Sequence, residues 1–153
     1  MSIKSKVAYI VATMLLIVSL SGCGTESQES PELTNTGVYD GYTLTLESAT
    51  PETDDTGKQL IRVNATYKND NSNPAYAYSC FSVRAFQNGQ ELTEISDING
   101  SESELIKEIK TGESLDVSYL YELSDNSDVE ILIGEPTADE TTIGKLTQSL
   151  ETK

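Results

Sequence analysis

Several residue types are absent or scarce in this chain of 153 residues, and each absence removes a class of function. There is no histidine, so the chain cannot build the imidazole base that serine and cysteine hydrolases commonly use. Catalytic zinc sites usually need at least one histidine as well. There is also no tryptophan for a sugar-stacking platform. We therefore expect no enzyme activity, no catalytic residue, no metal and no cofactor.

Basic residues are also scarce, because the chain has ten lysines and arginines but 25 aspartates and glutamates. Removal of an N-terminal signal that carries Lys4 and Lys6 would leave eight basic residues and a net charge of −17. Nucleic-acid binding requires clustered basic side chains, and those of this chain are scattered. We expect no nucleic-acid partner, and an acidic surface that keeps the protein soluble.

The N-terminus has the order of charge and hydrophobicity typical of an export signal. Lys4 and Lys6 precede an apolar or small run from Val7 to Leu20, which is shorter than the roughly 20 residues of a stable membrane span. The run leads into Leu20-Ser21-Gly22-Cys23. A signal-anchor helix with an incidental cysteine is the alternative interpretation.

The tetrapeptide that ends at Cys23 resembles the lipobox of bacterial lipoproteins. The resemblance implies that residues 1–22 are a signal peptide cleaved after Gly22, and that the Cys23 thiol receives a diacylglyceryl group. About two acyl chains suffice for stable membrane anchoring, so we expect a lipid-anchored protein on the extracytoplasmic face of the cell membrane. As a minor alternative, the released stretch Leu15–Gly22 resembles some bacterial peptide pheromones.

The mature chain divides into a tether and one domain. Residues 24–37 are mostly polar and contain one large apolar residue, Leu33, so they cannot offset the entropy lost on ordering. We expect residues 23–37 to form a flexible tether with Cys23 at its start, and residues 38–153 to form a single domain.

Apolar residues within that domain alternate with a period of two, which is typical of half-buried strands. Polar breaks at residues 51–57 and 69–74 separate the first strands, and a longer strand is expected from Tyr76 to Gln87. Asn88-Gly89 then predicts a tight hairpin, with Gln90–Ile95 folding back antiparallel. The alternating residues that should share faces are Tyr42, Leu44 and Leu46; Ile61, Val63, Ala65 and Tyr67; Leu115, Val117, Tyr119 and Tyr121; and Val129, Ile131 and Ile133.

Two segments are ambiguous. Ser101 to Glu104 has capping-box spacing before Leu105, which allows one short helix between residues 97 and 112. Residues 141–150 suit a closing strand or a helix equally. The many short strands predict an all-β fold, an antiparallel β-sandwich of about seven strands.

The order of several turn and strand segments is similar to a known family. The segments are Phe86–Leu92, Thr111–Leu115, Tyr119–Asp125 and Val129–Ile131. They resemble the small Gram-positive lipoproteins with an immunoglobulin-like, telokin-like domain, catalogued as domain of unknown function 5067. The resemblance would extend from about Tyr42 to Ile133. It implies an immunoglobulin-like fold and a surface location, but no reaction and no binding residues.

Few residues remain as candidates for chemistry. Cys80 is the only thiol besides Cys23, so no intramolecular disulfide is expected, and a small buried side chain is favoured over a reactive or bridging thiol. Three oxygen-rich loops, at residues 53–55, 69–73 and 125–128, are explained by ordinary turn chemistry rather than calcium binding.

The tyrosines are the remaining candidates for a binding surface, because each adds contact area and a hydroxyl. Tyr76 with Tyr78, and Tyr119 with Tyr121, could gather on one patch; the favoured alternative is that they are core or corner tyrosines, as sandwiches often contain. We expect a non-catalytic binding or interaction module for an envelope protein or peptide. The alternative function is a carboxylate- or calcium-dependent enzyme that acts on cell-wall glycans.

Overall fold

The computed structural model describes residues 32–96, 102–137 and 141–150. The predicted signal peptide, its cleavage at Gly22, the lipidation of Cys23 and the segment Leu15–Gly22 lie outside these residues. In the described ranges, no helix has the length and hydrophobicity needed to cross a membrane.

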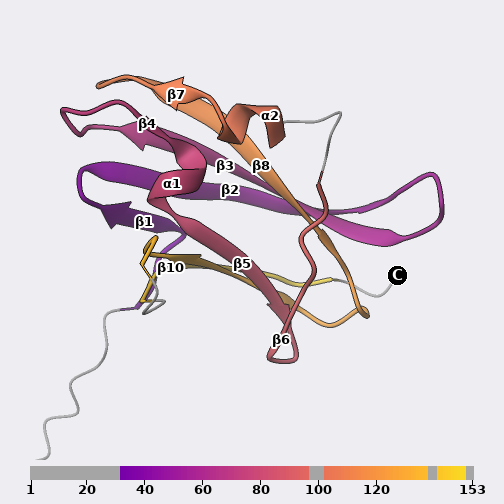
Figure 1. Cartoon of the computed structure of the whole chain (residues 1–153). Coiled ribbons are helices and arrows are strands. Elements are labelled where there is room, and N and C mark those ends of the chain that lie inside the picture. The colour runs from indigo at the N-terminus through magenta and orange to yellow at the C-terminus, as the bar shows by residue number, and fades with distance from the viewer. Residues whose placement is uncertain (1–31, 97–101, 138–140, 151–153) are drawn as a thin grey trace, which may run out of the picture. The chain divides into compact units, whose positions relative to one another are not determined.

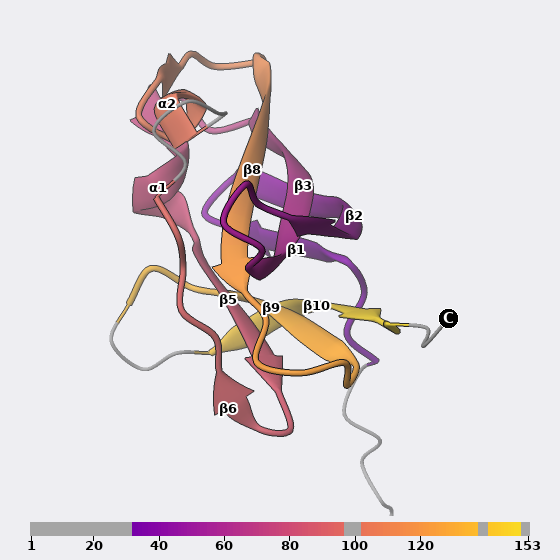
Figure 2. The same ribbon diagram turned by 90° about the vertical axis from the view of Figure 1, so that its right-hand side faces the viewer.

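Two four-stranded sheets stack on each other and confirm the predicted antiparallel β-sandwich (Figures 1 and 2). Sheet I has the order β1-β2-β3-β8 and sheet II the order β10-β9-β5-β6, with antiparallel neighbours throughout. Sheet I contains β1 (Thr36–Tyr39), β2 (Tyr42–Thr53), β3 (Gln59–Asn69) and β8 (Ser114–Glu122). Sheet II contains β10 (Thr142–Gln148), β9 (Val129–Gly134), β5 (Ser82–Gln87) and β6 (Gln90–Glu91).

The arrangement is immunoglobulin-like. Strands β2, β3 and β8 take the places of A, B and E in one sheet, and β5, β9 and β10 take those of C, F and G in the other. A two-stranded ribbon of β4 (Ala75–Tyr76) and β7 (Glu108–Ile109) lies outside both sheets. The short helices α1 (Ala77–Cys80) and α2 (Glu102–Leu105) flank it at one end of the sandwich (Figures 1 and 2).

The core between the sheets is built by the alternation seen in the sequence. Leu44, Leu46, Ile61 and Val63 on sheet I and Ile131 on sheet II are fully buried. Their sequence neighbours on the outer face of sheet I, such as the threonines of β2, remain partly exposed. The period of two therefore predicted correctly which side chains of these strands face inward.

The expected strand from Tyr76 to Gln87 is wrong, because it is interrupted by α1. Ala77 and Cys80, three positions apart, are both buried, as one helical turn allows and a strand does not. The Ser79 hydroxyl donates to the Tyr76 carbonyl at 2.8 Å and closes this turn. Cys80 is buried as expected, and the Tyr67 hydroxyl donates to its Sγ at 3.0 Å.

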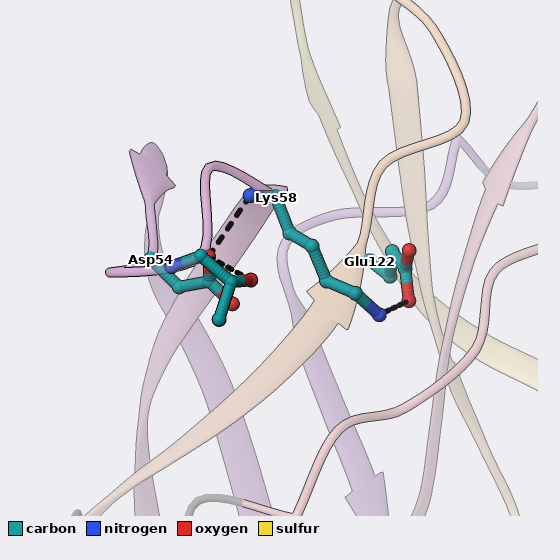
Figure 3. Close-up of polar contacts among 4 residues, drawn as sticks. Asp54, Lys58 and Glu122 are labelled. Carbon is teal, nitrogen blue, oxygen red and sulfur yellow. Dashed lines mark hydrogen bonds and ion pairs between the residues drawn. The ribbon is translucent and has the colours of Figure 1, made fainter.

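The break expected at residues 51–57 is shorter than predicted, since Pro51 to Thr53 belong to β2. Strand β1 covers only residues 42–45 of β2, so β2 has a free edge at Pro51, where a residue without an N–H is tolerated. The turn itself follows Asp54, whose Oδ1 accepts from the Lys58 amide (Figure 3). Lys58 Nζ also pairs with Glu122 of β8 at 2.9 Å.

The two ambiguous segments are resolved. Residues 142–148 form the strand β10, and the expected short helix is the single turn α2, while Ser101 lies outside the described residues.

The Asn88-Gly89 hairpin is confirmed, with φ of 51° and 75°. The strand after it pairs with β5 only as far as Leu92, whose amide donates to the Ala85 carbonyl. The segment then crosses to sheet I, where the Ile95 amide donates to the Leu120 carbonyl at 2.7 Å. The expected fold-back through Ile95 is therefore corrected: one segment joins both sheets and closes one side of the sandwich.

The opposite side is closed by the segment where the chain enters the domain. The Thr34 carbonyl accepts from the Lys145 amide of β10, and the Asn35 carbonyl accepts from the Leu46 amide of β2. Thr36 and Gly37, which we expected in the tether, are already part of β1. We call residues 34–37 with β10 the N-terminal seam.

Candidate binding surface

The four candidate tyrosines fall into two environments. Tyr76 and Tyr78 are 40% and 59% exposed, whereas Tyr119 and Tyr121 retain 7% and 2% of their surface. Tyr119 and Tyr121 lie on the inward face of β8 together with Val117, and burial raises the pKa of both phenols. A patch of four exposed rings is therefore not formed, and only Tyr76 and Tyr78 are available to a partner.

Tyr76 and Tyr78 lie together because the chain changes from strand to helix between them. Tyr76 ends β4 and Tyr78 lies in α1. Their ring centroids are 5.8 Å apart, and the ring planes are tilted by 30°. Since Ala77 and Cys80 take the buried side of α1, the two rings remain outside. We call Tyr76 and Tyr78 the tyrosine pair.

Tyr78, one member of the tyrosine pair, also lines a groove of about 530 Å³. Strand pairing explains it: Ser82 at the start of β5 lies opposite Gly134 at the end of β9, so the residues after β9 come beside α1. Phe81, 5% exposed, contributes to the lining of the groove. The complete lining is Tyr78, Ser79, Phe81, Ser82, Glu135, Pro136 and Thr137.

Two acidic residues, Glu108 and Glu135, neighbour the tyrosine pair. Glu108 of β7 lies directly opposite Tyr76 in the β4–β7 ribbon. Glu135 lines the groove, and its carboxylate makes no hydrogen bond or ion pair with any side chain that the structure describes. Both are acidic groups beside exposed aromatic rings.

A third exposed apolar residue belongs to the same end of the domain. Ile106 follows α2 directly and is 65% exposed. Figures 1 and 2 place α1, α2 and the β4–β7 ribbon together at that end. Tyr76, Tyr78 and Ile106 are three of the five exposed large hydrophobic side chains in the described ranges, the others being Leu33 and Val38.

Two further hollows were not singled out by the sequence. One, of about 360 Å³, lies on the outer face of sheet I, and its polar groups bond to one another or to neighbours, as Thr66 does to Asp116 and Asn64 to Ser48. The other, of about 570 Å³, includes Leu123 and Leu150 in its lining. Neither presents an exposed aromatic ring.

The oxygen-rich loops use their side chains for turns. The Thr56 hydroxyl and the Lys58 amide donate to Asp54, which holds the pKa of Asp54 below its ordinary value. Ser127 acts similarly on Asp125. In residues 69–73, Asn69 and Asn71 accept from backbone amides two positions ahead. Across the described ranges, no three acidic or cysteine side chains gather as a metal site would require.

Solved structures share this fold. A proposed lipoprotein from Staphylococcus aureus matches with a TM-score of 0.58 and 14% identity over 76% of this chain and 88% of its own. A protein from Enterococcus faecalis matches at 0.54 and 21%, over 76% and 90%. A proposed lipoprotein from Bacillus subtilis matches at 0.53 and 13%, over 76% of this chain and 38% of its own.

Sequence comparison identifies the family. No curated protein is significantly similar to the chain. A family model, the domain of unknown function DUF5067, matches residues 24–133. The match ends with β9 and leaves β10 outside, although β10 pairs with β9 along its whole length and forms the N-terminal seam. Because the match covers most of the sequence, the chain belongs to the DUF5067 family.

Proposed function

We propose that the chain is a lipoprotein, anchored through Cys23 on the extracytoplasmic face of the cell membrane, whose sandwich is a non-catalytic module that binds an envelope protein or peptide. Support for the anchor comes from the lipobox that ends at Cys23 and from the two proposed lipoproteins that share the fold. The observation that carries the binding role is the exposed tyrosine pair beside an open groove.

Exposed aromatic residues favour a binding role because they bury a large area at a small cost in side-chain entropy. Hot spots of protein interfaces are enriched in tyrosine. The acidic surface around the tyrosine pair disfavours nonspecific association with anionic polymers. A module of this kind needs no residue that carries out chemistry.

The anchor is tested by labelling cells with a radioactive fatty acid. The wild-type chain should carry the label and remain with the membrane, whereas Cys23→Ser should carry none. Unlabelled wild-type protein would contradict lipidation of Cys23, and a labelled Cys23→Ser protein would assign the lipid to another residue.

The binding role is tested by placing the photo-crosslinker p-benzoylphenylalanine at position 78 of the anchored chain in intact cells. We expect one discrete adduct, lost when Tyr76→Asp is added to the same chain. The matched control places the crosslinker at Thr147, an exposed position of β10. Equal adducts from both positions, or none from position 78, would contradict a partner at the tyrosine pair.

A further inference from the structure

We propose that the tyrosine pair and its groove take a lysine- or arginine-bearing peptide segment of the partner, with the cationic group over the rings and facing Glu135. This inference rests on the proposed binding role and adds the chemistry of the partner. Three observations carry it: the geometry of the rings, the balance of charge around them and the size of the groove.

The rings offer what a cation binds. Cation–π attraction places an ammonium or guanidinium group over an aromatic face within about 6 Å of the centroid. Two exposed rings whose centroids are 5.8 Å apart can share one such group. The chain makes this contact internally, since Arg84 Cζ lies 5.4 Å from the centroid of the Phe86 ring.

Charge around the pair favours a cation and disfavours an acidic partner. Glu135 lines the groove without an ion-pair partner among the described side chains, and Glu108 lies opposite Tyr76. Six of the seven basic side chains in the described ranges are paired with carboxylates, at Lys58, Arg62, Lys68, Arg84, Lys107 and Lys145. The field of the remaining carboxylates therefore attracts basic segments.

Lys110 is the exception, and it follows β7 at the same end of the domain. It has no ion pair with a described side chain, and its backbone amide donates to the Glu113 carboxylate. A cationic partner would be repelled by Lys110, whereas an acidic partner would use it. The effect of substituting Lys110 on partner binding therefore reveals the sign of the partner's charge.

The size of the groove favours a peptide segment. About 530 Å³ is within the range of sites that hold one drug-sized group, so it can accept one or two side chains but not a folded domain. The lining includes the Tyr78 and Phe81 rings and Pro136, and the hydroxyl of Ser82 is a hydrogen-bonding group for a peptide backbone. A single extended segment with a basic side chain can contact the aromatic rings, Pro136 and the Ser82 hydroxyl together.

The first experiment measures fluorescence anisotropy of labelled peptides with the chain from Gly24 to Lys153, which keeps every described residue, in about 0.1 M salt to limit long-range attraction. Gly-Arg-Gly-Arg-Gly should bind and Gly-Glu-Gly-Glu-Gly should not. Tyr76→Leu with Tyr78→Leu should weaken binding by about tenfold, because two rings are lost. Tyr78→Phe keeps the ring and should change it by less than about twofold.

A matched pair of charge variants separates a local site from general attraction. Glu135→Gln should weaken binding of the arginine peptide, whereas Asp55→Asn, with the same change of charge in the β2–β3 turn, should not. Lys110→Gln should leave the affinity unchanged or increase it. Equal weakening by Glu135→Gln and Asp55→Asn, or weaker binding by Lys110→Gln, would overturn the inference.

Three further outcomes test the inference. If tetramethylammonium displaces the arginine peptide at equal concentration, the site takes a small amine and the assignment to a peptide fails. If no arginine peptide binds while the adduct at position 78 persists in cells, the cationic partner is wrong and the binding role stands. If neither the adduct at position 78 nor binding of the arginine peptide is observed, the proposed binding function is wrong as well. Unchanged circular dichroism would show that each variant is folded.

Discussion

At the scale of single residues, burial separates tyrosines that the sequence treats alike. Tyr121 is 2% exposed, and its hydroxyl donates to the Val83 carbonyl of β5 at 2.8 Å. This hydrogen bond joins sheet I to sheet II. Tyr78, in contrast, has an exposed ring and no hydrogen bond from its hydroxyl to any described residue. The same type of side chain therefore links the two sheets in one place and is exposed on the surface in the other.

The first prediction is that Tyr121→Phe lowers the free energy of unfolding by about 1–2 kcal/mol, because the Val83 carbonyl is left in the core without this donor. Urea denaturation of the chain from Gly24 to Lys153 measures the change. The control, Tyr78→Phe, removes an exposed hydroxyl and should alter stability by less than about 0.5 kcal/mol. Similar losses for the two variants would argue against the link between the sheets.

At the scale of elements, the strand break at α1 creates the candidate site. Had residues 76–87 continued as one strand, strand alternation would have placed Tyr76, Tyr78 and Cys80 on the same face. The helical turn instead buries Cys80 while both rings remain outside. The pairing of Ser82 with Gly134 then brings the residues after β9 beside the turn. The tyrosine pair thus arises from a local change of conformation, and the groove from the pairing of β5 with β9.

Two glycines of the N-terminal seam, Gly37 and Gly144, occupy positions where a side chain would have little space. A methyl group on Gly144 would lie 2.8 Å from Ile133 Cδ1 and 3.1 Å from the Gly37 backbone nitrogen. A methyl group on Gly37 would lie 2.9 Å from Ile133 Cγ2. Because β1, β10 and Ile133 of β9 approach closely here, a methyl group at either position would force its neighbours to shift.

The second prediction is that Gly144→Ala opens this seam and costs about 1–3 kcal/mol by overpacking. Hydrogen exchange should accelerate at the Lys145 and Leu46 amides, which bond to Thr34 and Asn35. Gly134→Ala is the matched control, since its methyl group would have no neighbour closer than 3.6 Å. Unchanged exchange in Gly144→Ala would mean that β1 and β10 can separate without loss of these bonds.

At the scale of the whole molecule, excess negative charge opposes the compact state. The basic side chains are mostly held in exposed ion pairs, each of which contributes little to stability. The many remaining carboxylates repel one another. The domain therefore relies on its apolar core and closed edges, and a soluble form must include residues 34–37, because they bond to both sheets.

The third prediction is that the thermal midpoint of unfolding rises when sodium chloride is increased from about 0.01 M to 0.1 M, because the screening length falls from about 30 Å to about 10 Å. Differential scanning calorimetry measures the midpoint. A midpoint that falls with salt would show that the ion pairs outweigh the repulsion. Equal effects of sodium and potassium chloride would confirm that screening is responsible.

Part of this architecture follows from the sequence because it depends on neighbouring residues. Alternating hydrophobicity predicted the inward faces of β2, β3, β8 and β9, since strand geometry has a period of two. Asn88-Gly89 predicted the hairpin, since both residues tolerate positive φ. The lipobox prediction at Cys23 is also local, because it concerns a short motif.

Other features were decided only by tertiary structure, because they depend on strands far apart in the sequence. The pattern from Tyr76 to Gln87 suited a strand, but β4 pairs with β7 and the chain must turn to enter sheet II. Residues 34–37 are too polar to predict as part of a core, yet they bond to β2 and β10. The sequence by itself determined most of the strands and their buried faces. Which tyrosines stay exposed was decided by tertiary structure: sheet packing buries Tyr119 and Tyr121, and the turn at α1 leaves Tyr76 and Tyr78 outside.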